Sequence, residues 1–236
     1  MIYAYRYTLV ALYTIFWASV VCVLCIFDRS GDRAVGCVRL WARWILVSCG
    51  IEVEVEGRDG IDPQIASVVM SNHQSVFDIL ALVSTLPLEW RFVAKRELTW
   101  IPFFGWGLVA AGHIIIDRGR TERAVASLKQ AAERVREGVS VIIFPEGTRS
   151  ETDDLRPFKS GGFHLAIQAQ APILPVSISG SCKITPRNSL RIEAGRILVR
   201  YGRAIPTLGA TAEDRDRLKQ GVRSAIVAGI DPALQG

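Results

Sequence analysis

Residues 67–78, SVVMSNHQSVFD, are the part of the chain that decides the fold. The run SVVM is short and continuously apolar, as a strand covered on both faces is. Residues 72–74 interrupt it as a turn, and Ser75 is a residue type that caps helices at their N-termini. The stretch therefore predicts a strand, a turn and then a helix that holds Asp78 in its first turn.

The same alternation of short apolar runs and helix-like stretches continues along the chain after Gly50. Strands that alternate with helices are typical of α/β proteins. We therefore expect a single α/β sandwich domain over residues 51–236, with a mixed central sheet flanked by helices. The expected strands cover residues 51–56, 67–70, 113–116, 140–144, 173–178 and 196–201, and the expected helices cover residues 76–86, 121–137, 162–170 and 211–228.

The N-terminal part of the chain has a different pattern, with long apolar runs. Residues 7–27, YTLVALYTIFWASVVCVLCIF, carry no charge and reach the length of about 20 residues that a helix needs to cross a bilayer. Residues 35–51 form a second, amphipathic stretch, in which Arg39 and Arg43 lie one helical turn apart among apolar and tryptophan side chains. Residues 1–50 are therefore expected to be a membrane-anchoring helix pair ahead of the α/β domain.

Charge gives the expected orientation of this anchor. Four arginines follow the apolar segment and one precedes it, so the positive-inside rule places the α/β domain at the cytoplasmic face of the inner or plasma membrane. A helix pair that enters one leaflet and returns has the same composition, and the sequence leaves both geometries open. The net charge of +5 suits an anionic partner, such as a phosphorylated substrate or an acidic membrane surface, and no nucleic-acid partner is expected.

Several common catalytic signatures are missing from the sequence. It has no G-x-S-x-G elbow, no G-x-x-x-x-G-K-[ST] phosphate loop and no G-x-G-x-x-G fingerprint. Its three histidines, His73, His113 and His164, are not spaced as a metal-binding triad. Covalent serine hydrolysis, nucleotide binding and a metal centre are therefore not indicated, and we expect ordinary structural roles for His113 and His164.

His73 and Asp78 have a spacing that does not fit one helix face. Five residues turn a helix by about 500°, which leaves the two side chains about 140° apart, so they can meet only if His73 precedes the helix. There Asp78 could hold one imidazole nitrogen and leave the other to take a proton from a hydroxyl, a contribution of roughly 10²- to 10⁴-fold to a rate. Taken alone, the pair also fits a capping motif without a catalytic role.

A second polar motif, FPEGTRS at residues 144–150, follows the predicted strand at residues 140–144. Ligands of open α/β sheets bind at this end of the strands. The glycine of the motif permits a tight backbone turn, and its glutamate, arginine and two hydroxyl side chains could contact a ligand. A charged surface turn remains the alternative.

Together and in this order, the two motifs resemble sequence blocks of the glycerolipid acyltransferase family, which includes lysophosphatidic acid acyltransferases. Two further stretches are similar to the other blocks of that family: GHIIIDR at residues 112–118 and the proline-containing APILPV at residues 171–176. The first of these two departs modestly from the pattern, with Ile115 where an aromatic residue is common. The similarity spans residues 72–176.

The resemblance implies a mechanism. His73 would be the general base, and Asp78 would orient it. The free hydroxyl of a lysophospholipid acceptor would then attack the thioester of an acyl donor directly, without an acyl-enzyme.

The resemblance also implies how the acceptor is bound. Arg118 and Arg149 would hold its phosphate, with Lys95 as a helper, since a planar guanidinium matches phosphate oxygens in pairs. Glu146 would bind a glycerol hydroxyl or hold Arg149 in place, and Gly147 would let backbone N–H groups approach the substrate. The full substrate-binding set is Lys95, Arg118, Glu146, Gly147, Thr148 and Arg149.

By this resemblance the protein is a membrane-bound acyltransferase of phospholipid biosynthesis. It would move a fatty acyl group from acyl-CoA or acyl carrier protein to the sn-2 hydroxyl of 1-acylglycerol 3-phosphate, giving phosphatidic acid, with no metal and no cofactor beyond the acyl co-substrate. Its partners would be membrane lipids, the lysophospholipid acceptor and the acyl donor. Two alternatives stay open: the same chemistry on another lysophospholipid or a lyso-ornithine lipid, and a catalytically inactive membrane-anchored binding protein.

Overall fold

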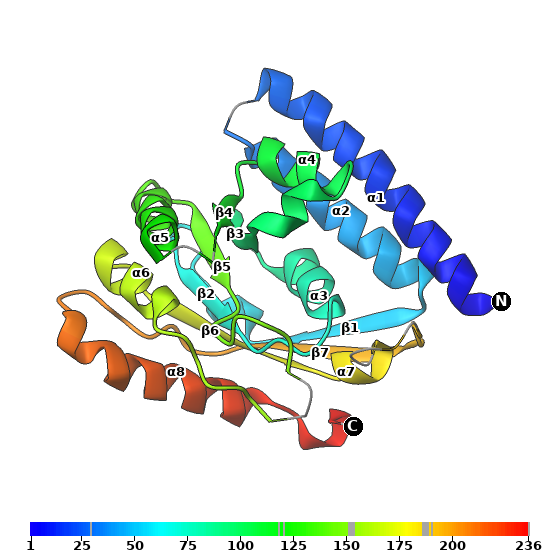
Figure 1. Cartoon of the computed structure of the whole chain (residues 1–236). Coiled ribbons are helices and arrows are strands. Elements are labelled where there is room, and N and C mark those ends of the chain that lie inside the picture. The colour runs from blue at the N-terminus through cyan, green and yellow to red at the C-terminus, as the bar shows by residue number, and fades with distance from the viewer. Residues whose placement is uncertain are drawn as a thin grey trace.

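The structure is a computed structural model that describes residues 1–28, 30–117, 119, 121–150, 154–185, 189 and 191–235, with Thr121 described by its backbone alone. These residues form a seven-stranded sheet with helices on both faces (Figure 1). The strands are β1 (Ile51–Glu56), β2 (Val68–Ser71), β3 (Trp90–Lys95), β4 (Ile114–Ile116), β5 (Ser140–Ile143), β6 (Ile173–Ser179) and β7 (Gly195–Tyr201).

The spatial order of the strands is β1-β7-β6-β2-β5-β3-β4. Neighbouring strands run parallel, except that β6 and β7 are antiparallel. The expected fold, an α/β domain with a mixed central sheet, is therefore confirmed. Because β2 and β5 are adjacent and parallel, the segments that follow them leave the sheet at the same edge.

All of the strands expected from the sequence are present, with ends that differ by at most one residue, but β3 was not expected. Its sequence, WRFVAK, lacks a continuous apolar run because Arg91 interrupts it. Arg91 is nevertheless only 3% exposed, in a strand that lies between β5 and β4. Its side chain is accommodated by partners far away in the sequence, which a local pattern does not reveal.

Two groups of helices cover the two faces of the sheet (Figure 1). One group packs near α3 and contains α1 (Ile2–Phe27), α2 (Asp32–Ser48), α3 (Phe77–Thr85) and α4 (Phe104–Ala110). The other contains α5 (Thr121–Arg136), α6 (Gly161–Ala169) and α8 (Arg215–Gly229). Short elements complete the described chain: α7 (Ser181–Ile184) and the 3-10 turns η1 (Arg58–Gly60), η2 (Arg96–Trp100), η3 (Ala212–Asp214) and η4 (Pro232–Leu234).

Strand β2 is buried on both faces, as its apolar run predicts. Val69 packs in the core shared with α2 and α3, whereas Val68 and Met70 pack in the core shared with α5, α6 and α8. All three side chains have no exposed surface. Burial of each such side chain contributes roughly 1.5–3 kcal/mol to the stability of the fold. The polar turn after β2 therefore follows a strand that apolar cores hold on both sides of the sheet.

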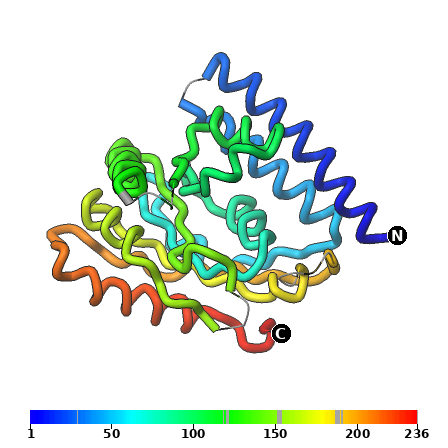
Figure 2. Tube along the Cα trace, in the orientation of Figure 1, coloured from blue at the N-terminus to red at the C-terminus, as the bar shows by residue number. Residues whose placement is uncertain are grey.

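The N-terminal helices form an antiparallel pair along one side of the molecule (Figure 2). α2 belongs to the core, since Ala42, Ile45 and Leu46 are at most 3% exposed and pack in one cluster with α3 and the sheet. α1 has Val21 as its buried residue and is long and apolar enough to cross a membrane. The two predicted parts, residues 1–50 and 51–236, thus share a core through α2, and their separation into domains stays a prediction.

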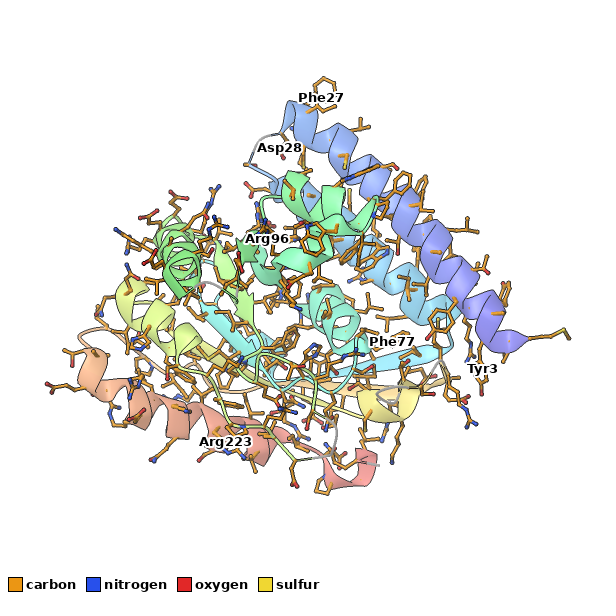
Figure 3. All side chains as sticks on the ribbon, viewed as in Figure 1. Tyr3, Phe27, Asp28, Phe77, Arg96 and Arg223 are labelled. Atoms are coloured by element: carbon orange, nitrogen blue, oxygen red, sulfur yellow. The ribbon has the colours of Figure 1, made fainter. Side chains whose placement is uncertain are left out.

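α1 is attached to the sheet domain near its N-terminal end. The hydroxyl of Tyr3 donates to the carboxylate of Glu193, and the guanidinium of Arg6 donates to the carbonyl oxygen of Ile192. Figure 3 shows Tyr3 beside the sheet domain and Phe27, at the other end of α1, projecting away from it. The helix therefore lies along the domain instead of pointing away from it.

Arg91 attaches the turn between α1 and α2 to the sheet. Its guanidinium donates to the carbonyl oxygen of Ser30 over 2.6 Å, to the carboxylate of Asp32 over 2.9 Å and to the carbonyl oxygen of Trp90 over 2.9 Å. One buried cation thus satisfies acceptors on both the helix pair and β3. This explains why a charged residue lies in a buried strand.

We expect Arg91→Ala to weaken the attachment of the helix pair. Because Asp32 is about half exposed and water can replace its partner, we expect a loss of about 2 kcal/mol in the free energy of unfolding, with new protease sensitivity in the turn between α1 and α2. Denaturant unfolding and limited proteolysis in detergent measure both. Arg33→Ala is the control, because the Arg33 side chain is 74% exposed and its Nε atom lies 3.9 Å from Oδ2 of Asp28. Equal effects of the two variants would contradict the role of Arg91 in attaching the helix pair.

Candidate active site

A buried asparagine fixes the point where β2 ends. The side-chain amide of Asn72 donates to the carbonyl oxygen of Ile178 over 2.8 Å, and its oxygen accepts from the N–H of Ile178, also over 2.8 Å. Asn72 has no exposed surface. Its amide therefore extends the pairing of β2 with β6 by one step and sets the position of the next residue, His73.

His73 lies in the turn and meets Asp78 across it. The Nδ1 atom of His73 lies 3.0 Å from Oδ2 of Asp78. The same oxygen accepts from the backbone N–H groups of Gln74, over 2.7 Å, and Ser75, over 2.8 Å. Asp78 is fully buried in the first turn of α3. The structure thus brings the two side chains together with His73 ahead of the helix.

The start of α3 differs slightly from the expected one. The helix begins at Phe77 with Val76 at the N-cap position, one residue later than a cap at Ser75 predicts. The hydroxyl of Ser75 still accepts from the N–H of Phe77, over 3.3 Å. Asp78 holds the backbone N–H groups ahead of the helix, so the carboxylate shares the capping role that was predicted for the serine alone.

The contact with Asp78 determines which imidazole nitrogen is available. Because Oδ2 of Asp78 also accepts from two backbone N–H groups, Nδ1 of His73 is the donor in this contact, and in the neutral ring Nε2 then presents a lone pair. The imidazole also stacks on the ring of Phe144, with 4.1 Å between ring centroids and 19° between ring planes. Phe144 and Asp78 together fix the plane of the imidazole, as a general base requires.

The segment after β5 holds the backbone of His73 on both sides. The N–H of His73 donates to Oε1 of Glu146 over 2.7 Å, and its carbonyl oxygen accepts from the N–H of Ser150, also over 2.7 Å. The other carboxylate oxygen of Glu146 accepts from the N–H of Arg156 over 2.9 Å. The two predicted motifs, NHQSVFD and FPEGTRS, are therefore joined through backbone hydrogen bonds.

Glu146 is buried, with 2% of its surface exposed. Burial raises the pKa of its carboxyl group, and the hydrogen bonds from the N–H groups of Arg156 and His73 oppose this rise. Both of its oxygens accept from backbone groups. These contacts favour a role in holding the His73 turn over direct contact with a glycerol hydroxyl.

Gly147 occupies a position that other residues would strain. Its φ is +75°, and its N–H donates to the carbonyl oxygen of Phe144 over 3.0 Å, which closes a tight turn after β5. A Cβ at this position would lie 2.9 Å from Cε of Lys159. Both the backbone conformation and the close approach of the lysine therefore favour glycine.

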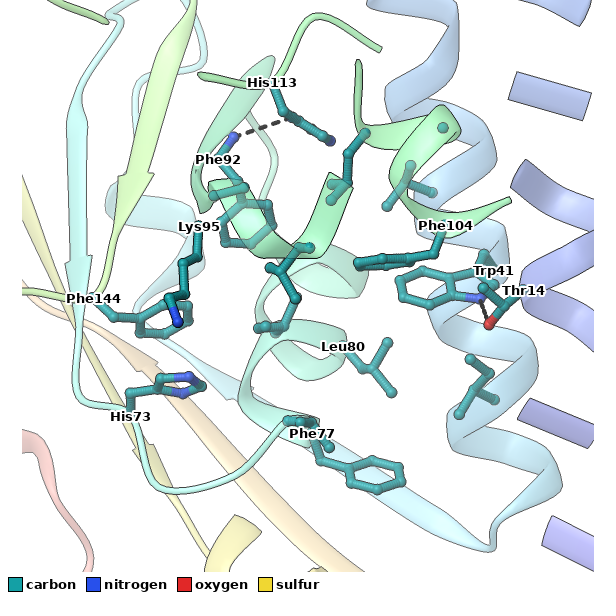
Figure 4. Close-up of a pocket in the computed structure, with 18 of the residues that line it drawn as sticks. Thr14, Trp41, His73, Phe77, Leu80, Phe92, Lys95, Phe104, His113 and Phe144 are labelled. Atoms are coloured by element: carbon teal, nitrogen blue, oxygen red, sulfur yellow. Dashed lines mark hydrogen bonds between the residues drawn. The ribbon is translucent and has the colours of Figure 1, made fainter. Parts of the chain in front are cut away.

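An apolar cavity of about 680 Å³ opens beside His73. Residues of α1, α2, α3, β3 and α4 form its walls. Figure 4 shows His73, Lys95 and Phe144 on one side of the cavity, with Trp41 and Thr14 on the opposite side. Such a volume lies within the usual range of ligand pockets, roughly 300–1,000 Å³.

Most of the predicted substrate-binding residues line this cavity. Lys95, Gly147, Thr148 and Arg149 do so, and Lys95 and Arg149 are the charged side chains among the described lining residues. The ammonium of Lys95 is 3.3 Å from the carboxylate of Glu97, and both side chains are about half exposed. Arg118, the other predicted phosphate ligand, lies outside the described residues.

His113, for which the sequence indicates a structural role, also lines the cavity. Its Nδ1 accepts from the N–H of Phe92 over 3.2 Å, and its ring stacks on Trp90 with 5.7 Å between centroids. Burial lowers the pKa of His113 to about 3, so its imidazole is neutral near pH 7. It satisfies the β3 backbone just before β4 begins.

Sequence reasoning did not single out two residues that orient His73, Asn72 and Phe144. Asn72 belongs to the first motif, and its position directly after a buried strand could have indicated a role in ending that strand. Phe144 begins the second motif, but nothing in the sequence indicates that its ring lies under the imidazole. Both contacts depend on which strands are neighbours in the sheet.

The family to which the protein belongs follows from comparison of its sequence with family models. The model described as Acyltransferase matches residues 52–179, more than half of the chain. This range includes both the His73 turn and the segment after β5. The chain therefore belongs to the acyltransferase family, as the resemblance of its motifs indicates.

The names of individual relatives are more specific than the name of the family. The chain is 38% identical to 1-acyl-sn-glycerol-3-phosphate acyltransferase alpha of Homo sapiens over 191 residues, which cover 80% of this chain and 68% of that protein. It is 36% identical to the human beta enzyme over 201 residues, covering 84% and 71%. The crystal structure of PlsC, the 1-acyl-sn-glycerophosphate (LPA) acyltransferase of Thermotoga maritima, aligns with a TM-score of 0.83 at 25% identity, covering 96% of this chain and 92% of that one.

We expect Glu146→Gln to lower kcat for acyl transfer by roughly tenfold to a hundredfold. Each carboxylate oxygen of Glu146 accepts from one backbone N–H group, but glutamine has only one acceptor oxygen. One of the two backbone N–H groups would then face the amide N–H of the glutamine, which weakens the positioning of His73 by about 1–3 kcal/mol. A positioning role leaves KM for the acceptor within about twofold. Steady-state kinetics separate the two parameters.

The exposed Glu137 provides the control, since Glu137→Gln changes a surface ion pair only. If Glu146→Gln instead raised KM for the acceptor and left kcat unchanged, Glu146 would contact the substrate directly.

Proposed function

We propose that the protein transfers a fatty acyl group from an acyl thioester, acyl-CoA or acyl carrier protein, to the sn-2 hydroxyl of 1-acylglycerol 3-phosphate. The product is phosphatidic acid, a step of phospholipid biosynthesis. The observation that carries this proposal is the His73–Asp78 contact of 3.0 Å at an apolar cavity that also presents Lys95 and Arg149. The names of the relatives support the choice of acceptor.

In the proposed reaction, Nε2 of His73 takes the proton of the sn-2 hydroxyl as its oxygen attacks the thioester carbonyl. Asp78 stabilises the imidazolium that forms, because its carboxylate is already bonded to Nδ1. The tetrahedral intermediate then collapses, the C–S bond breaks and the thiolate takes up the proton. The acyl group passes directly to the acceptor, so no enzyme nucleophile is needed, and neither a metal nor a prosthetic group takes part.

The phosphate of the acceptor is proposed to bind at the charged side of the cavity. Lys95 and Arg149 offer positive charge there, and Thr148 offers a hydroxyl donor. Arg118 is also proposed to bind the phosphate, on the basis of its sequence motif alone. Because the remaining lining is largely apolar, the cations attract the head group to one side and leave the other for hydrocarbon.

The apolar part of the cavity is proposed to hold an acyl chain. Each buried CH₂ group contributes about 0.8 kcal/mol, so a chain gains more from this cavity than from water. α1 and α2 supply part of the wall, through residues that include Thr14 and Trp41. The helix pair thus has a role in substrate binding in addition to anchoring the protein.

The protein is proposed to act at the cytoplasmic face of the membrane, with α1 as its main anchor. Several side chains of α1 are more than half exposed and apolar, including Leu12, Phe16 and Val23. The bonds of Tyr3 and Arg6 to the loop before β7 support a geometry in which α1 lies along the sheet domain within one leaflet. Its apolar face then meets lipid while the sheet domain stays outside.

The acceptor is tested directly by incubating the purified full chain in detergent with a panel of lysolipids and acyl donors. We expect acylation of 1-acylglycerol 3-phosphate to be fastest, and we expect His73→Ala to lower its rate by roughly 10²- to 10⁴-fold. His164→Ala is the control, because His164 is an exposed histidine of α6.

Failure of every acceptor, or a His73→Ala variant as active as the native chain, would exclude the acyltransferase reaction. Faster acylation of a lysophospholipid with a larger head group, or of a lyso-ornithine lipid, would replace the acceptor and keep the chemistry.

The role of Arg149 is tested by comparing acceptors with and without a phosphate. Loss of one charge-assisted contact costs about 1.5–3 kcal/mol, so Arg149→Ala should raise the Michaelis constant for 1-acylglycerol 3-phosphate by roughly tenfold to a hundredfold. The Michaelis constant for a monoacylglycerol, which lacks the phosphate, should stay the same. Arg203→Ala, a change at an exposed residue, is the control; equal changes for both acceptors would rule out phosphate binding by Arg149.

A further inference from the structure

Residues 98–116 form a second stretch without charged residues, in the middle of the sheet domain. In the sequence it is bordered by charged residues of both signs, with Lys95, Arg96 and Glu97 before it and Asp117, Arg118 and Arg120 after it. Tryptophans in an apolar segment are typical of contact with the head-group region of a membrane. The proposed reaction gives the exposed side of this stretch no role.

The first part of the stretch, residues 98–109, exposes large apolar side chains. It contains the end of η2 and most of α4. Trp100 is 70% exposed, Ile101 47%, Trp106 56% and Val109 59%. We call residues 98–109 the aromatic segment. Four such side chains over so short a length form an apolar patch that a soluble surface would rarely carry.

The inner side of the aromatic segment lines the cavity. Leu98, Phe104 and Leu108 are among the lining residues, and the ring of Phe104 packs against that of Trp41 in α2, with 6.3 Å between centroids. The cavity and the exposed patch thus lie on opposite sides of one layer of chain. Figure 4 shows Phe104 and Trp41 side by side at the cavity.

A strained turn shapes the aromatic segment between η2 and α4. Phe103 has φ +61° and ψ −60°, and the N–H of Phe104 donates to the carbonyl oxygen of Pro102 over 2.7 Å. These values define a γ-turn of the rare kind, whose strain is of order 1–3 kcal/mol. The turn places the rings of Phe103 and Trp106 with 5.0 Å between their centroids. The surrounding packing must hold the turn in place.

The aromatic segment adjoins α1. Gly107 is packed against Ala18, since a Cβ on the glycine would lie 3.4 Å from the Cβ of the alanine. Ile15, one helical turn before Ala18, is 42% exposed, and Trp106 is exposed beside Gly107. Figure 1 shows α4 lying beside α1. The apolar surface of α1 therefore continues onto the aromatic segment.

We propose that the aromatic segment inserts into a phospholipid bilayer together with α1, with Trp100 and Trp106 at the level of the lipid head groups. The inference rests on the proposed function in that the substrates are membrane lipids. The bilayer is the occupant because the patch carries tryptophans and continues the exposed apolar surface of α1, a helix long and apolar enough to cross a membrane. Part of the cavity wall is then itself a membrane-contacting element, and the aromatic segment and α1 separate acyl chains in the cavity from lipid.

The test uses the full chain labelled with 5-fluorotryptophan and reconstituted with phosphatidylcholine vesicles. Fluorine NMR resolves the six tryptophans of the chain, and Trp100→Phe and Trp106→Phe assign the two signals of interest. A spin-labelled lipid broadens signals inside the bilayer, and a water-soluble paramagnetic chelate broadens signals in water. Trp90, which has no exposed surface, is the internal control for both agents, and Trp44 of α2, 43% exposed, reports on the N-terminal helices.

We expect the spin-labelled lipid to broaden the signals of Trp100 and Trp106 severalfold more than that of Trp90, and more than the chelate broadens them. Broadening by the chelate alone would overturn the inference, as would protection from both agents, which indicates a second copy of the chain on the patch. If Trp44 is broadened by the lipid and Trp100 and Trp106 are not, the inference fails and the proposed anchoring stands. If none of these signals responds to the lipid, the proposed anchoring fails as well.

Discussion

Two hydrogen bonds to the backbone of His73, one at its N–H and one at its carbonyl oxygen, hold the site together. Glu146 accepts from the N–H of His73, and Ser150 donates to its carbonyl oxygen. These bonds can form because β2 and β5 are neighbouring parallel strands that end at the same edge of the sheet. The stacking of the imidazole on Phe144 and its contact with Asp78 both depend on this placement of the backbone. The site therefore requires the whole sheet order, and neither motif alone would create it.

The local parts of this arrangement could be predicted from the sequence. The strand, the turn and the helix around His73 follow from a short apolar run and turn-forming residues, and the spacing to Asp78 requires the histidine to precede the helix. The bond of Glu146 to the N–H of His73 could not be predicted, because the two residues lie 73 positions apart in the sequence. The same reason applies to β3, where a buried arginine is satisfied by the turn between α1 and α2.

The N-terminal helices illustrate a second limit of sequence reasoning. Hydrocarbon and a protein core are both apolar, so the hydrophobicity of a helix does not distinguish them. Both stretches were expected to contact the membrane. α2 also places Ile45 and Leu46 in the same core as the sheet, while α1 keeps a largely exposed apolar surface. The difference in burial between α1 and α2 depends on how much of each helix surface α3 and α4 cover. The fold determines this, and the sequence of the helix does not.

The bonds of α1 to the loop before β7 have a consequence for the order of assembly. α1 leaves the ribosome long before Ile192 and Glu193, its partners near the far end of the chain, have been made. Strand β1 waits equally long, because its partner in the sheet is β7. During this interval α2, which is made directly after α1 and packs against it, and a lipid bilayer are the apolar surfaces that α1 can contact. If α1 anchors the protein as proposed, the sheet domain is completed around a helix that is already at the membrane.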